Sequence, residues 1–165
     1  MRHTNLRVIP VLALLALGLS TAAPLAAGDE PVLTISGRIN GGEGSVALER
    51  SAIEALGVVS IETHTPWNEG LVRFEGVPLD VLMEHAKAEG EIATVVALND
   101  YSSEVPFSDF SEHQVILAVK RNGQYMPVDD QGPFFIIYPY DSDEALQTQV
   151  YYGRSVWQVK EIVVE

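Results

Sequence analysis

Short apolar runs, separated by turn residues, constrain the fold of this chain more than any other feature of its sequence. The runs Val32–Ile39, Val58–Thr65, Thr94–Leu98 and Phe134–Tyr138 are five to eight residues long and rich in β-branched and aromatic residues. That length and composition are typical of β-strands. Glycine, proline, asparagine and aspartate lie between the runs, where they favour turns. The sequence therefore predicts a domain built mainly on several short strands.

Further segments complete the predicted architecture. Ser45–Gly57 and Leu79–Gly90 place apolar residues near helical spacing, and each ends in glycine, which commonly stops a helix. Asn122-Gly123 lies between two apolar runs and predicts a hairpin, while Ser155–Glu165 alternates like a closing strand. We therefore expect an α+β fold with mixed β-sheets and two or three short helices.

The first 27 residues have the three parts of a secretory signal peptide. Met1–Arg7 is basic, Val8–Leu19 is apolar, and small residues follow up to Ala27. The apolar run is too short for a comfortable membrane span, although a retained N-terminal anchor is the alternative. We predict removal of residues 1–27, export to the periplasm, and a single domain over residues 28–165.

Charge and the absence of cysteine exclude several classes of function. Without Arg2 and Arg7, the exported chain carries 8 basic and 23 acidic side chains, a formal net charge of −15. Such a chain has no basic stripe for nucleic acid or anionic lipid. Because the sequence contains no cysteine, it has no disulfide, no thiolate nucleophile and no thiolate metal ligand.

Metal and nucleophile motifs are also missing from the sequence. His64, His85 and His113 are isolated, without a second histidine at the spacing of a zinc site. The acidic segments 129–130 and 141–143 lack the spacing of an EF-hand, so we interpret them as solvated loops rather than a calcium site. No G-x-S-x-G motif is present, so the sequence offers no signature of a serine nucleophile.

Aromatic, amide and charged residues gather where the predicted strands end. Each has an ordinary explanation as a turn, core or surface residue, and each can also face a ligand. A flat heteroaromatic ligand would stack on rings and pair two neighbouring N–H donors with one carboxylate. The candidate ligand-binding residues are Trp67, Asn68, Asn99, Asp100, Tyr101, Tyr138 and Arg154.

Four segments follow one another along the chain: "TPWNEGLVRFEGVPLDVLMEHA", "VVALNDYSSEVPFSDF", "VILAVKRNGQYMPVDDQGPFFIIYP" and "RSVWQVKEIVV". Their order resembles that of the sulfite-oxidase-type molybdopterin-binding domain, in its small, exported, cysteine-free form. A short motif such as F-x-G-V-P-L is weak alone, but the order and spacing are specific. The resemblance covers residues 32–165 and implies the fold of that family.

The resemblance also implies a ligand and a partner. The large enzymes of the family hold molybdenum through a cysteine thiolate and the pterin dithiolene, and this chain has no cysteine. It is similar to cysteine-free periplasmic members that bind a reduced pterin without metal. Such members regulate a membrane-bound cyclic-di-GMP enzyme through its periplasmic domain. We therefore expect a pterin as ligand, no molybdenum, and a binding protein rather than an enzyme.

Two other functions stay open at this point. One is a molybdopterin-dependent oxidoreductase whose metal is held by a side chain other than cysteine, and the other is a module that binds a protein partner. In the pterin interpretation, Asp100 forms the pocket floor and accepts the 2-amino and N3–H groups. Asn99 meets the 4-oxo group or N5, Trp67 or Tyr101 covers the ring, and Arg154 donates to an oxo group or a side-chain hydroxyl.

Overall fold

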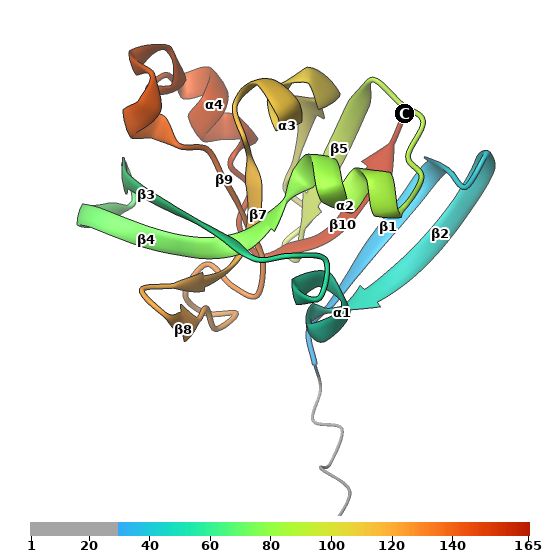
Figure 1. Ribbon diagram of the computed structural model, residues 1–165, viewed down its shortest axis with the longest axis horizontal. Coiled ribbons are helices and arrows are strands. Elements are labelled where there is room, and N and C mark those ends of the chain that lie inside the picture. The colour runs from blue at the N-terminus through green and yellow to red at the C-terminus, as the bar shows by residue number, and fades with distance from the viewer. Residues whose placement is uncertain (1–29) are drawn as a thin grey trace, which may run out of the picture.

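The strands of the protein form two five-stranded sheets (Figure 1). The computed structural model describes residues 30–165, so the predicted signal segment 1–27 lies outside the described residues. The first sheet has the order β2-β1-β10-β5-β6, with β1 at Val32–Ile39, β2 at Gly42–Glu49, β5 at Ile92–Ala97, β6 at Ser102–Pro106 and β10 at Val159–Val164. In this sheet β1 and β10 are parallel, whereas the other neighbours are antiparallel.

The second sheet is antiparallel and has the order β3-β4-β7-β8, with β9 also paired to β7. Its strands are β3 at Val59–Thr65, β4 at Asn68–Pro78, β7 at Ile116–Arg121, β8 at Gln124–Tyr125 and β9 at Phe135–Ile137. The described helices are α1 at Arg50–Glu54, α2 at Leu79–His85, α3 at Phe107–Glu112 and α4 at Gln149–Arg154, with 3₁₀ turns η1 at Tyr140–Ser142 and η2 at Glu144–Leu146.

The α+β class with mixed sheets is confirmed, with four short α-helices in the described residues instead of two or three. No helix within residues 30–165 is long and apolar enough to cross a membrane.

Strand β7 is the centre of the second sheet and contributes to two hydrophobic clusters. Successive side chains of a strand point to opposite faces. Leu117 and Val119 therefore pack into the main cluster, between the sheets and helices, and Ile116 and Ala118 pack into a smaller cluster on the other face. Because both faces are covered, this strand is a continuous apolar run in the sequence.

The F-x-G-V-P-L segment joins β4 to α2, and its residues have distinct structural roles. Phe74 and Val77 are fully buried, and Pro78 precedes the first residue of α2. The strand pairing shifts between Glu75 and Gly76, and a Cβ at Gly76 would lie 2.1 Å from the carbonyl oxygen of Leu117. Only glycine allows β7 to approach β4 so closely.

Replacing Gly76 by alanine is expected to lower the free energy of unfolding by about 2 kcal/mol, because the methyl group would push β7 away from β4. Urea unfolding followed by circular dichroism would measure the loss. Gly42→Ala is the matched control, since a Cβ at Gly42 meets nothing within 4 Å. Equal unfolding midpoints for the two variants would contradict the close approach.

Two predictions of helical structure were partly wrong. Residues 45–49 belong to β2 rather than to a helix, because Val46 and Leu48 alternate toward the core and pair with β1. Only Arg50–Glu54 is α-helical in that segment. The second helix ends at His85, earlier than the predicted end at Gly90, and Lys87 has a positive φ of 49° that stops the helix.

Candidate functional site

A pocket of about 400 Å³ lies where three segments far apart in the sequence meet. Trp67 comes from the β3–β4 turn, Asn99 and Tyr101 come from the β5–β6 turn, and the third wall is α4 with the residues after it. The complete lining is Trp67, Ala97, Asn99, Tyr101, Gln149, Tyr152, Gly153, Ser155, Val156 and Trp157. Its volume is within the range of small-molecule sites, about 300–1,000 Å³.

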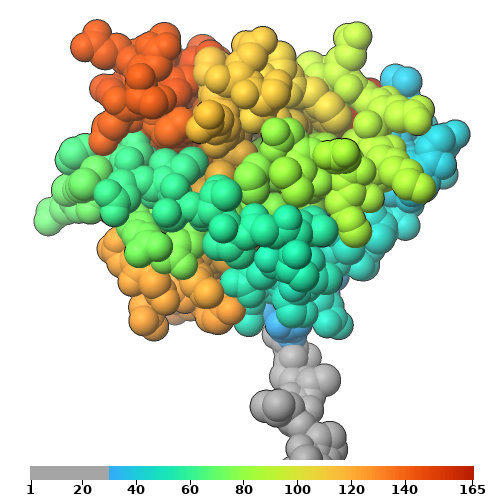
Figure 2. Space-filling view, in the orientation of Figure 1, coloured from blue at the N-terminus to red at the C-terminus, as the bar shows by residue number. Residues whose placement is uncertain are grey.

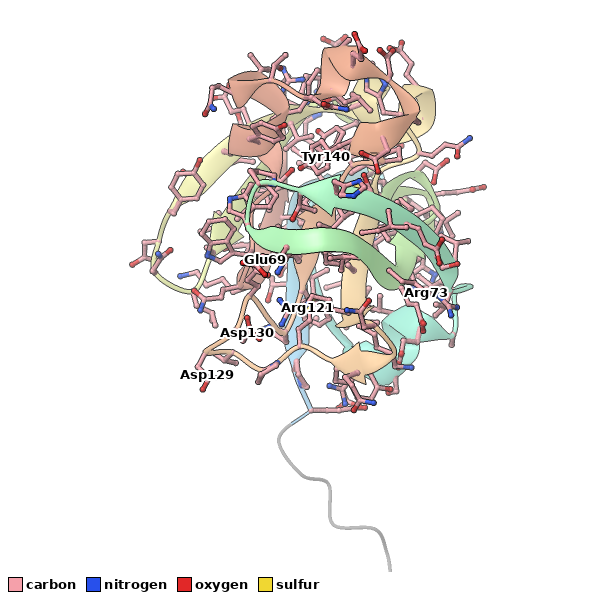
Figure 3. The ribbon with its side chains drawn as sticks, turned by 90° about the vertical axis from the view of Figure 1, so that its left-hand side faces the viewer. Glu69, Arg73, Arg121, Asp129, Asp130 and Tyr140 are labelled. Atoms are coloured by element: carbon pink, nitrogen blue, oxygen red, sulfur yellow. The ribbon has the colours of Figure 1, made fainter. Side chains whose placement is uncertain are left out.

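Trp67 is the centre of the aromatic wall. Its ring centroid lies 5.6 Å from that of Trp157, 5.9 Å from that of Tyr152, 6.2 Å from that of Tyr140 and 5.5 Å from that of Phe135. Edge-to-face and tilted pairs at these separations are favourable. The cluster therefore fixes the orientation of Trp67, although this residue lies in a turn. Figure 3 shows Tyr140 above the β3–β4 hairpin that carries Trp67.

The polar groups of the pocket are neutral. The described residues that line it include the amides of Asn99 and Gln149 and the hydroxyl of Ser155, but no acidic or basic side chain. The side chain of Asn99 accepts a hydrogen bond from the Tyr101 backbone N–H at 3.1 Å, and the Tyr101 hydroxyl donates to the Gly153 carbonyl at 3.1 Å. The second bond joins the β5–β6 turn to α4 across the pocket wall.

A buried network supports the α4 wall from behind. Oδ2 of Asp109 accepts hydrogen bonds from the Tyr138 hydroxyl at 2.7 Å and from Nη1 of Arg154 at 2.8 Å. The Asp109 side chain is 7% exposed and that of Arg154 is 23% exposed, so the ion pair is largely shielded from water. Burial, followed by the hydrogen bond to Asp109, raises the pKa of Tyr138, which keeps this phenol protonated.

Ser155 links this wall to the aromatic cluster. Its hydroxyl donates to the Tyr151 carbonyl at 2.8 Å, and the Tyr140 hydroxyl is hydrogen-bonded to the same oxygen. Because Ser155 has one proton to donate, Tyr140 is the donor to Ser155. Burial raises the pKa of Tyr140, so its hydroxyl keeps the proton that this bond requires.

The structure brings together three of the seven candidate residues. Trp67, Asn99 and Tyr101 line the pocket. Tyr138 and Arg154 lie behind its wall, where they bond to Asp109 rather than face the cavity.

Asn68 also lies outside the pocket lining. Its backbone N–H and its side chain both hydrogen-bond the Thr65 hydroxyl, which closes the β3–β4 turn. This residue therefore holds the turn that presents Trp67.

The placement of Asp100 corrects the predicted pocket floor. Its side chain is 83% exposed, does not line the pocket, and forms an ion pair with Lys160. The hydrogen bond and then the charge of Lys160 hold the pKa of Asp100 below its ordinary value. Asp100 also has a positive φ of 64°, a conformation that Asp tolerates in turns. Asp100 therefore lies in the turn between β5 and β6, as its ordinary explanation as a turn residue would have it.

The α4 wall was not predicted from the sequence. Gln149, Tyr152, Gly153 and Ser155 belong to a helix of six residues and its C-cap, which is too short to give a helical apolar period. The sequence features that could have indicated this wall are the two adjacent tyrosines before Gly153 and the nearby Trp157. Trp157 is 37% exposed, which is unusual for a residue so apolar and fits a place at the pocket mouth.

The acidic loops are held by basic partners from the same chain. Arg121 pairs with Asp130 and also donates to the Gln131 side chain at 2.8 Å, below the β3–β4 hairpin in Figure 3. Asp141 accepts hydrogen bonds from the His64 ring at 2.8 Å and from the His64 backbone N–H at 3.0 Å. Residues 30–165 contain no group of three or more His, Cys, Asp or Glu that could hold a metal ion.

The two sheets and the short helices define the class of the protein as a mixed α+β domain. The family model of the oxidoreductase molybdopterin binding domain matches residues 49–141, which is more than half of the chain. The chain belongs to this family, which confirms the resemblance seen in the sequence. No curated protein matches the sequence. The matched segment supplies Trp67, Asn99 and Tyr101, whereas α4 lies beyond it.

The residues present do not fit the molybdenum centre of the family's large enzymes. The sequence contains no cysteine to supply the thiolate, and the described residues offer no alternative cluster of metal ligands. Molybdopterin is also a phosphate ester, and the described residues that line the pocket include no basic side chain to receive a phosphate. The aromatic walls and neutral amides do fit an uncharged bicyclic heteroaromatic ring.

Proposed function

We propose that this protein binds a reduced pterin without molybdenum in the pocket between Trp67, Tyr152 and Trp157. The observation that carries the proposal is the pocket lining, in which aromatic rings surround neutral hydrogen-bonding groups. A pterin has a flat pyrimidinone ring that can stack on an aromatic side chain, and an edge of alternating donors and acceptors. The amides of Asn99 and Gln149 can each donate and accept, so they match such an edge without a net charge.

The proposed role is regulation rather than catalysis. In this role the protein resides in the periplasm and reports its ligand to a membrane-bound signalling protein, such as a cyclic-di-GMP enzyme, through a periplasmic domain. The neutral pocket supports this role, because the described residues that line it include no carboxylate, imidazole or amine, the commonest general acids and bases.

The experiment uses the two tryptophans of the sequence, Trp67 and Trp157, both of which line the pocket. Titration with tetrahydrobiopterin, without oxygen, should quench tryptophan fluorescence in a saturable manner. Trp157→Ala should weaken binding by about tenfold or more, since stacking on one ring contributes about 1–3 kcal/mol for a nucleobase. Tyr125→Ala, on β8 and outside this pocket, should leave the affinity unchanged.

Two further measurements separate the alternatives. A phosphate ester of the same pterin should bind more weakly than the free pterin, because the pocket gives its charge no partner. Protein purified from its own compartment should release a pterin on denaturation. Stoichiometric molybdenum in that sample would instead support the oxidoreductase with a ligand other than cysteine. Saturable quenching that Trp157→Ala does not alter would count against this pocket.

A further inference from the structure

Strand β3 is an edge strand whose outer side is only partly covered. Among the strands of residues 30–165, it pairs with β4 alone, on one side. Near its C-terminal end, η1 covers the edge, where Asp141 accepts from the backbone N–H of His64. The earlier residues of β3 have no such cover, and Val59, Ser60 and Glu62 are exposed. An edge of this kind presents unpaired N–H and C=O groups.

The direction of the free backbone groups follows from two hydrogen bonds. The backbone N–H of His64 points to Asp141, away from β4, and that of Arg73, which lies opposite Glu62, points to Asn122 rather than to β3. In an antiparallel pair the bonding direction alternates from residue to residue. The backbone N–H and C=O groups of Ser60 and Glu62 therefore point to the free edge.

A shallow apolar groove runs beside this part of the edge. Its volume is about 270 Å³, and it is lined by Val59, Ser60, Ile61, Pro78, Asp80, Val81, Gln114 and Ile116. In Figure 2, β3 and α2 lie together on the face turned toward the viewer. A strand added beside β3 would place every second side chain next to Val59 and Ile61, over the groove.

The charge of this edge defines the partner. The other side chains of an added strand would meet the face of Ser60 and Glu62, and Asp80 lies at the groove. Arg73, which lies opposite Glu62 on β4, is paired with Glu75 at 3.3 Å. None of the ion pairs within residues 30–165 includes Glu62. A second copy of this acidic chain would bring like charges together, which is unfavourable. Lysine or arginine would be favourable there.

We propose that residues 59–62 of β3 form a docking edge for an extended segment of a partner protein, in which apolar residues alternate with basic residues. The segment would continue the second sheet as an antiparallel or parallel strand, with its apolar side chains in the groove and its basic side chains near Glu62. The free edge leads along β3 to Trp67 in the next turn, so the docking surface and the pocket share one hairpin. The docking edge is independent of which ligand the pocket holds.

The test uses the full chain and a seven-residue peptide of alternating lysine and valine with blocked ends. The peptide should shift the backbone amide resonances of Ser60 and Glu62 and slow their hydrogen exchange, and a matched peptide with glutamate in place of lysine should not. Ser60→Pro should weaken binding by about tenfold, because proline removes the outward N–H. Proline is tolerated at such a position, since that N–H makes no bond to β4.

A charge reversal keeps the test informative if Ser60→Pro does not fold. Glu62→Lys should weaken binding of the lysine peptide by about two- to fivefold and improve binding of the glutamate peptide. Glu43→Lys on the edge strand β2 is the matched control and should change neither. The proposal would be overturned if the peptide did not bind, or if it protected β2 instead of β3 from exchange. It would also be overturned if sedimentation showed a dimer that Glu62→Lys makes more stable. None of these results depends on pterin binding.

Discussion

Replacing Asp109 by alanine is expected to lower the free energy of unfolding by about 3 kcal/mol. The change would leave the guanidinium of Arg154 without its partner and the buried hydroxyl of Tyr138 without an acceptor. Breaking a buried ion pair by removing one member costs about 3–5 kcal/mol, and the 23% exposure of Arg154 places this pair at the lower end. Urea unfolding would measure the change, and α4 should lose protection from hydrogen exchange.

Two control variants separate the loss of the buried ion pair from other effects on stability. Asp100→Asn removes the charge of an acid whose pair with Lys160 is on the surface, and asparagine also tolerates the left-handed backbone, so its unfolding midpoint should equal that of the parent protein. Tyr138→Phe removes one hydrogen bond but keeps the ion pair, and should cost about 1 kcal/mol. If Asp109→Ala is no less stable than Asp100→Asn, the ion pair does not support the pocket wall.

Replacing Trp67 by alanine should both destabilise the protein and remove the proposed pterin binding. The side chain packs against both hydrophobic clusters and touches the rings of Phe135, Tyr140 and Trp157. Loss of a large aromatic side chain from a packed site costs about 3–5 kcal/mol, and we expect a value near 3 kcal/mol because Trp67 is only partly buried. The same change removes one wall of the pocket.

The comparison with Trp157→Ala separates folding from binding. Trp157 is 37% exposed, so its removal should weaken binding with a smaller loss of stability. Trp67→Phe should keep most of the stability and part of the stacking. Unfolding midpoints and fluorescence titrations on the same samples would test both effects. A Trp67→Ala variant that is as stable as Trp157→Ala would contradict the central position of Trp67 in the cluster.

The strand pattern of the fold could be predicted because the alternation of apolar residues is local. Val32–Ile39 is the first strand at the predicted boundaries, and the Asn122-Gly123 hairpin is present between β7 and β8. Ser45–Glu49 was misassigned to a helix, because Ala47 is also apolar and hides the alternation of Val46 and Leu48. Strand β6 was missed because Ser102 and Ser103 are turn-forming residues that here pair with β5.

The pocket could be predicted only in part, because its walls meet through tertiary contacts. Trp67, Asn99 and Tyr101 follow strands and were found from that position. Asp100 has the same sequence context, but its left-handed backbone turns the carboxylate toward Lys160. Asp109 was not singled out, because nothing local shows that its carboxylate meets Tyr138 and Arg154 from distant segments.

The parallel pairing of β1 with β10 has a kinetic consequence. Thr34 lies beside Glu161, so the first sheet joins the start of the described chain to its end, and β10 also carries β5 on its other side. Pairings between residues so distant in sequence form late in folding and slow it. The pocket needs Trp157 from the segment just before β10. A chain still being synthesised therefore has no complete pocket until this last strand has joined the sheet.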